Sequence, residues 1–75
     1  PDAPRVPIGR RLRALLEHRG LPHDELRRIT GVSKSAVSSW MNAHSYPTIE
    51  QLVMICDALD VSADVLLGRA PLVLE

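Results

Sequence analysis

Apolar residues recur at helical spacing in five short segments of this chain, and each segment is bounded by a residue that starts or ends a helix. The first segment has an i, i+4, i+7, i+8 stripe formed by Ile8, Leu12, Leu15 and Leu16. It predicts a helix that runs to about Arg19 and ends at Gly20. No segment shows the sustained period-two alternation of a strand, so the sequence predicts an all-α fold.

The next two segments are short and lie on either side of a glycine. Pro22 suits the first position of a second helix, which ends before Gly31. Ser33 can accept a hydrogen bond from backbone N–H groups, which predicts that it caps the start of a third helix. The inward positions of that helix are Val37 and either Trp40 or Met41.

The fourth and fifth segments complete a compact five-helix domain over residues 8–68. Thr48 and Gln51 form a capping box ahead of the longest apolar stripe, which we expect to be the central core helix: Ile49, Leu52, Val53, Ile55, Cys56 and Leu59. Ser62 caps the fifth helix and Gly68 ends it. We expect residues 1–7 to be an N-terminal arm and residues 69–75 a C-terminal tail, either a cloning remnant or the start of a missing segment.

The small size and sparse chemistry of the chain exclude several classes of protein. Its 75 residues suffice for one small core without a deep cleft. The single cysteine allows no internal disulfide, and its place on an apolar stripe is typical of an inert core residue. His18, His23 and His44 are too scattered for a metal site, and no general base accompanies the serines. We therefore expect a cytoplasmic protein that is not an enzyme and needs no cofactor or metal.

The unit from Leu26 to Trp40 carries the functional signal. It is a two-turn helix, a tight turn containing Gly31, and a helix with apolar residues on its inner side only. Two such helices cross steeply, and the second presents its outer face at the surface. Since the major groove of DNA is about 12 Å wide and admits one helix, this arrangement favours DNA binding.

The sequence resembles the phage-repressor/Cro-like (XRE-like) helix-turn-helix family over nearly its whole length. The matching stretches are residues 8–13, 25–26, 30–40, 46–52, 58–62 and 66–68. The resemblance implies a five-helix domain that binds double-stranded DNA sequence-specifically and regulates transcription, with repression as the expected outcome. It also implies pseudo-palindromic DNA bound by a homodimer, for which we expect helix five and the C-terminal tail to form the interface.

The same resemblance assigns candidate contact residues. The family's base-reading positions fall on Lys34, Ser35 and Ser39. Phosphate or supporting contacts fall on residues around the third helix: His23, Ser33, Ser38 and Asn42. Independently of the resemblance, we expect the positive charges of helix one to attract phosphate where they face the DNA, with Arg10 as the expected contact: Arg10, Arg11 and Arg13. His23 occupies a position where the family often has a glutamine that touches a phosphate.

Three positions depart from the family pattern. Arg27 stands where the family prefers alanine, so its guanidinium must either reach solvent or push the helices apart. Ala43 stands where a glycine commonly adopts positive φ. Leu16 and Met41 replace a frequent arginine–glutamate pair, so an apolar contact is expected there.

The charge distribution and these departures leave two functions open. Net charge is zero, yet residues 1–34 hold eight basic and four acidic side chains, whereas residues 35–75 hold one basic and five acidic. The acid-free face from Ser33 to Asn42 favours DNA. Arg27 and the small side chains of helix three favour the alternative, a protein-interaction module of the same fold such as an adaptor or antitoxin subunit.

Overall fold

Five helices and their connections make up the part of the chain that the structure, a computed structural model, describes: residues 6–73. They are α1 (Ile8–His18), α2 (Glu25–Thr30), α3 (Lys34–Met41), α4 (Ile49–Leu59) and α5 (Ala63–Leu66). No strand occurs between residues 6 and 73, so the all-α class is confirmed. Residues 1–5 of the expected arm and residues 74–75 of the expected tail lie outside the described residues.

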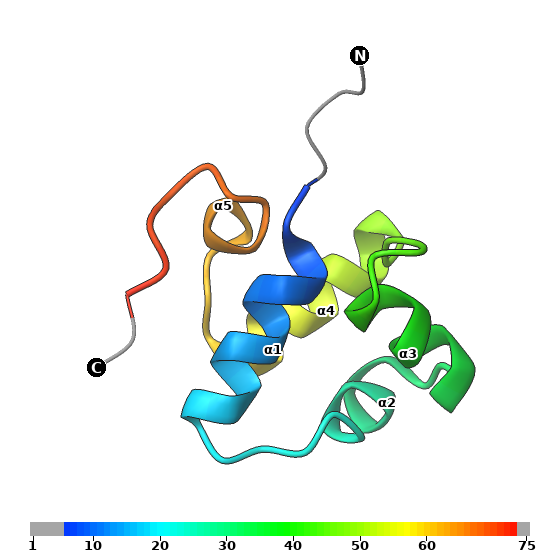
Figure 1. The fold of residues 1–75 in the computed structure, drawn as a ribbon. Helices are drawn as coiled ribbons and strands as arrows, with labels where there is room; N and C mark the ends of the chain where they lie inside the picture. The colour runs from blue at the N-terminus through cyan, green and yellow to red at the C-terminus, as the bar shows by residue number, and fades with distance from the viewer. Residues whose placement is uncertain (1–5, 74–75) are drawn as a thin grey trace.

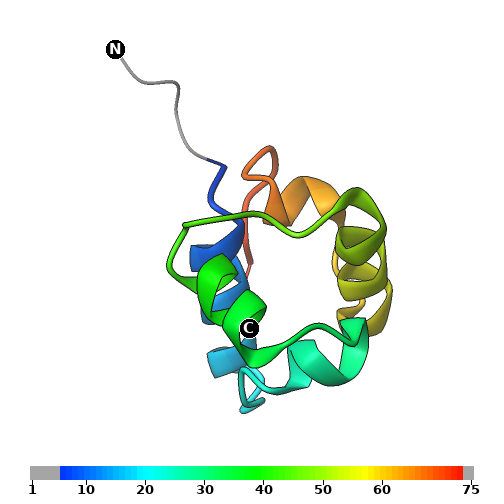
Figure 2. The ribbon, with the colours of Figure 1, turned by 90° about the vertical axis from the view of Figure 1, so that its right-hand side faces the viewer.

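The helices enclose a single apolar core. α1 packs against α3 and α5, whereas α4 packs against α2 and α5, and α2 also contacts α3 (Figures 1 and 2). The largest fully buried side chains come from four of the five helices: Leu12, Leu16, Leu26, Ile55 and Leu66. No helix in this part of the chain is long and apolar enough to span a bilayer.

The most heavily buried helix is α1 rather than α4. The predicted stripe of α1 is buried, and Gly9 is buried with it. α4 buries only Ile55, Cys56 and Leu59, while Ile49 is 82% exposed and Val53 is 53% exposed. The expectation that α4 forms the centre of the core is therefore wrong, because its apolar residues encircle the helix and only one side meets α2 and α5.

The predicted helix caps are present. Ser33 Oγ accepts from Ala36 N at 3.2 Å, and Ser62 Oγ accepts from Asp64 N at 3.1 Å. Thr48 and Gln51 form the reciprocal capping box. The glycines expected to end helices adopt the left-handed conformation that this role requires: Gly20, Gly31 and Gly68.

The second helix begins later than predicted. Glu25 N donates to Pro22 O at 3.0 Å and Leu26 N donates to His23 O at 3.1 Å, so each bond spans three residues. Such bonds form a tight turn rather than an α-helix. Pro22 therefore precedes a turn and is not the first residue of α2, which starts at Glu25.

Arginine side chains tie the helices together at their carboxyl ends. Arg11 Nη1 donates to Val65 O at 2.9 Å and to Ala70 O at 2.7 Å, which fixes α5 and the following residues to α1. Arg19 donates to Leu59 O at the end of α4. Leu59 and Val65 belong to the last turns of α4 and α5, so the guanidinium charges complement the negative ends of these helix dipoles.

Candidate nucleic-acid interface

Helix α3 presents a polar face outward, as its sequence predicted. Val37, Trp40 and Met41 are buried, so both proposed inward positions after Val37 point into the core. The opposite face carries exposed polar side chains from Lys34, Ser35, Ser38 and Asn42, with Ser39 half-buried at its edge. No acidic residue occurs between Ser33 and Asn42.

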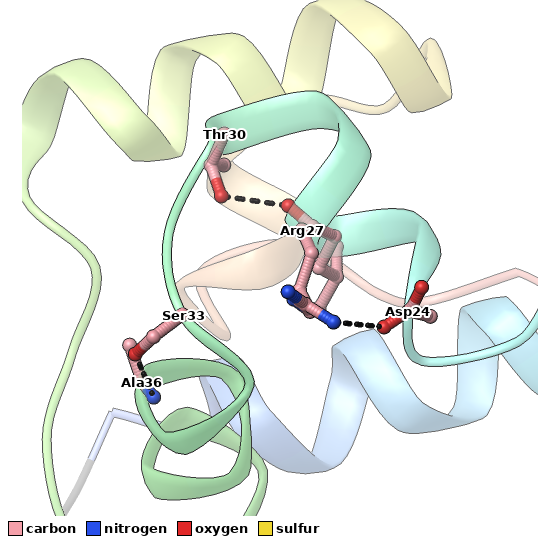
Figure 3. Close-up of polar contacts among 6 residues, drawn as sticks. Asp24, Arg27, Thr30, Ser33 and Ala36 are labelled. Carbon is pink, nitrogen blue, oxygen red and sulfur yellow. Dashed lines mark hydrogen bonds and ion pairs between the residues drawn. The ribbon is translucent and has the colours of Figure 1, made fainter.

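Local contacts shape the end of α2 and the start of α3 (Figure 3). Gly31 has φ of 77°, which lets the chain turn sharply after α2. Thr30 Oγ1 donates to Leu26 O at 2.6 Å at the end of α2, and the Ser33 cap then starts α3. The predicted helix–turn–helix unit is thus formed by α2, the turn at Gly31 and α3.

The predicted contact residues differ in how free their side chains are. Lys34 and Ser35 have no hydrogen-bond or ion-pair partner among residues 6–73. Ser39 Oγ instead lies 2.7 Å from Ser45 Oγ in the loop after α3. Asn42 Nδ2 donates to Ser38 Oγ at 3.3 Å. Lys34 and Ser35 are therefore the most available of the proposed contact groups.

The remaining predicted site residues lie around this face. Ser33 uses its hydroxyl as the helix cap, which makes its role a supporting one. His23 is half-buried in the turn before α2, close enough to α3 to share a pocket with Lys34. Arg10 is exposed on α1 and lies outside that pocket.

Arg27 reaches solvent and does not disrupt the motif. Its side chain leaves α2 on the side toward α3 and bends back to Asp24, whose Oδ1 lies 3.1 Å from Arg27 Nη1 (Figure 3). The Arg27 side chain is 44% exposed, and α2 still packs against α3. Of the two outcomes expected for this arginine, the structure shows the first.

A pocket of about 500 Å³ opens between α1, the start of α2, and α3. Its charged lining consists of Arg13, Arg27 and Lys34 against the single carboxylate of Asp24, with His23 beside them. The wall that α3 contributes also contains Val37, Ser38, Met41 and Asn42. This lining makes the pocket electropositive and suits it to an anion.

The sequence predicts contact roles for five residues that line this pocket: Arg13, His23, Lys34, Ser38 and Asn42. It assigns no such role to Asp24 or Arg27. Arg27 was noticed only as a departure from the family pattern. Its i, i+3 spacing from Asp24 was the signal that could have placed the pair on one face. Nothing in the local sequence indicates that Arg13, one helix away, shares the pocket.

Two other departures from the family pattern are explained by the structure. Ala43 has φ of 61°, so alanine adopts the left-handed conformation expected of the glycine. Leu16 and Met41 are both buried in the same apolar core, as expected for the replacement of an ion pair.

Desolvation raises the pKa of the buried Cys56 thiol, which keeps it protonated and a poor nucleophile. Between residues 6 and 73, no three His, Cys, Asp or Glu side chains are grouped as a metal site would need.

Comparisons with known proteins agree with this geometry. The model of the helix-turn-helix family matches residues 12–66. The chain is 32% identical to the P22 c2 repressor protein, solved in complex with synthetic operator 9T in the presence of Tl⁺. That match covers 84% of this chain and 96% of the repressor chain, with a TM-score of 0.74.

A second solved structure supports the fold alone. It is a transcriptional regulator from Listeria innocua, with 23% identity and a TM-score of 0.80. The match covers 93% of this chain but only 65% of the regulator's own length. A search of curated proteins found no match.

Proposed function

Because the chain belongs to the phage-repressor/Cro-like (XRE-like) helix-turn-helix family, we propose that it binds double-stranded DNA sequence-specifically and regulates transcription, with repression as its effect. The family consists of transcriptional regulators rather than enzymes. In this proposal α3 enters the major groove with its polar face toward the base edges.

The observation that carries the proposal is the exposed, acid-free face of α3 beside an electropositive pocket. Lys34, at the first residue of α3, has no partner within residues 6–73 and stands at the end of the helix that approaches the bases first. A cation at the positive end of a helix dipole is unfavourable for the helix itself. Contact with guanine or phosphate offsets that cost, and lysine to guanine is a common specific contact.

The small side chains of α3 limit direct readout. Ser35 is free to contact a base, whereas Ser39 already has a hydrogen-bond partner in Ser45. Serine hydroxyls both donate and accept, so they discriminate bases weakly. We therefore assign part of the specificity to bridging waters and DNA shape, with phosphate contacts from His23, Ser38, Asn42 and Arg10 setting the register.

Selection of duplexes from a randomised pool, followed by binding measurements over a range of salt concentrations, tests the proposal. A sequence-specific binder enriches a pseudo-palindromic site with half-sites about 34 Å apart. Its log–log salt dependence has a slope of about −0.9 per phosphate contact. No enrichment and no retardation of mixed duplex at low salt would refute DNA binding.

We propose further that the chain dimerises on DNA through α5 and the tail. Arg11 of α1 bonds to Val65 O in α5 and to Ala70 O in the chain after it, and Val73 further along is 70% exposed. Sedimentation of Val73→Asp on the selected duplex should show loss of the two-to-one complex. Ile49→Asp, at the 82% exposed position on α4, is the matched control and should leave that complex intact.

One observation favours the alternative function, a protein-interaction module of the same fold. α4 exposes Ile49, Val53 and Met54 on its surface, as an interaction helix would. If the wild-type chain enriches no duplex and does not retard mixed duplex at low salt, the adaptor or antitoxin role replaces the DNA-binding one.

A further inference from the structure

Two arginines from different helices line the same pocket and are only partly engaged by protein groups. Arg13 comes from α1 and Arg27 from α2. Arg13 Nη2 donates to Met41 O at 3.3 Å, and Arg27 Nη1 donates to Asp24 Oδ1 at 3.1 Å. Since a guanidinium has five N–H donors, most donors of each group remain available.

The pair between Arg27 and Asp24 is poorly protected from water. The side chains are 44% and 67% exposed, respectively, and the pair spans only three residues of one turn. Exposed pairs of this kind contribute little stability because solvent screens them and holding two long side chains costs entropy. Arg27 can therefore exchange the carboxylate for another oxyanion at small cost.

The pocket is continuous with the proposed groove-facing surface. Lys34, Ser38 and Asn42 belong to the outward polar face of α3 and also line the pocket. A duplex that receives α3 in its groove brings a flanking backbone strand alongside that wall. Phosphate oxygens match the fork of a guanidinium, which makes arginine a preferred phosphate ligand.

We propose that this pocket is a phosphate site in which Arg13 and Arg27 hold one backbone phosphodiester of the bound duplex, Arg27 giving up Asp24 to do so. The inference rests on the proposed DNA-binding function and extends it to two residues outside the recognition helix. It also gives a role to the arginine that departs from the family pattern. Asp24 acts as an internal competitor that weakens binding to any polyanion.

Arg27→Ala tests the site, and Arg28→Ala is its matched control. Arg28 carries the same charge on the same helix, but it pairs with Glu25 and does not line the pocket. Anisotropy titrations with the selected duplex and a scrambled duplex should show the Arg27→Ala salt slope shallower by about 0.9. The affinity loss should be the same factor on both duplexes, while Arg28→Ala leaves the slope unchanged.

Two further variants separate the contact from general electrostatics. Arg27→Lys should retain the salt slope, because counterion release depends on the charge, but should bind both duplexes more weakly because lysine lacks the guanidinium fork. Asp24→Asn should tighten binding to both duplexes, and the gain should shrink in the Arg27→Ala background. Thermal unfolding of each variant checks that the fold is intact.

Free phosphate distinguishes the source of the ligand. Inorganic phosphate or a mononucleotide, added at constant ionic strength, should shift the Nε–H NMR signals of Arg13 and Arg27 only weakly. Strong shifts together with an unchanged Arg27→Ala salt slope would assign the pocket to a small phosphorylated ligand and overturn the proposal.

The remaining outcomes are also decisive. An unchanged salt slope for Arg27→Ala overturns the phosphate site even when the wild-type chain binds DNA tightly. A loss confined to the selected duplex makes Arg27 a base-reading residue and overturns it too. Absence of binding by the wild-type chain refutes the proposed function itself, and this is seen before any variant is compared.

Discussion

Gly9 sets the distance between α1 and α3, and its replacement by alanine gives the sharpest test of the packing. A Cβ at this position would overlap Trp40 O and lie 3.1 Å from Trp40 C and 3.3 Å from Met41 Cα. All three are backbone atoms, so no flexible side chain can move aside. The two helices must separate, or the end of α3 must shift.

The expected cost can be worked out from two opposing effects. Replacing glycine by alanine within a helix normally stabilises it by about 0.5–1 kcal/mol. Overpacking a close-packed core costs about 1–3 kcal/mol, and rigid backbone contacts place Gly9→Ala near the upper end. The net loss is therefore about 2 kcal/mol, which lowers the Tm of a domain of this size by about 8–16 °C.

Thermal and urea unfolding followed by far-UV circular dichroism measure this change. Ala14→Gly on the same helix is the control, because it makes the reverse substitution. It should lower stability by about 0.5–1 kcal/mol through helix propensity alone. If Gly9→Ala has a Tm equal to or above that of the wild-type chain, helix propensity has prevailed and the close α1–α3 contact is refuted.

Three further predictions concern the turn after α3, the proposed base contact and the response to acid. Ala43→Gly should stabilise the fold by about 0.5–1 kcal/mol, because the left-handed strain it removes exceeds the entropy it adds to the unfolded chain; a lower Tm would contradict this. Lys34→Ala should cost about 1–3 kcal/mol on the selected duplex and relax preference at one base pair, whereas an equal loss on all sequences would make Lys34 a phosphate contact. The hydrogen bond from Arg28 lowers the pKa of Glu25 below its usual 4.5. The pair therefore stabilises the fold fully at pH values above the unfolded-state pKa of Glu25. This contribution is lost as the pH falls through the lower, folded-state pKa. Glu25→Gln should therefore reduce the difference in unfolding free energy between neutral and acidic pH, and an unchanged difference would show that the pair contributes nothing.

Local signals in the sequence predicted most of the fold. Ser33, Thr48 and Ser62 cap helices as expected, and Gly31 forms the turn between α2 and α3. These features depend on residues within about one turn of one another, so the sequence order is sufficient to reveal them.

Predictions that required knowledge of distant neighbours were less complete. Ile49 and Val53 fit an apolar stripe by spacing, yet they are exposed because no other helix covers that side of α4. Arg11 was treated as a source of attraction for phosphate, but it is hydrogen-bonded to backbone carbonyls 54 and 59 residues away. Spacing along one helix contains no information about such partners.

Some features of the candidate interface could be predicted from the sequence, and others depend on how the helices pack. The polar face of α3, with Lys34 and Ser35 exposed, follows from the helical period and the inward positions of its apolar residues. The tertiary structure alone decided that Ser39 is bonded to Ser45 and that Arg13 shares a pocket with Arg27. The positions of the helices and the polar face of α3 thus follow from the order of residues along the chain, because hydrogen bonds within a helix join near neighbours. Packing determined which charges face one another, because only folding brings α1, α2 and α3 to the same place.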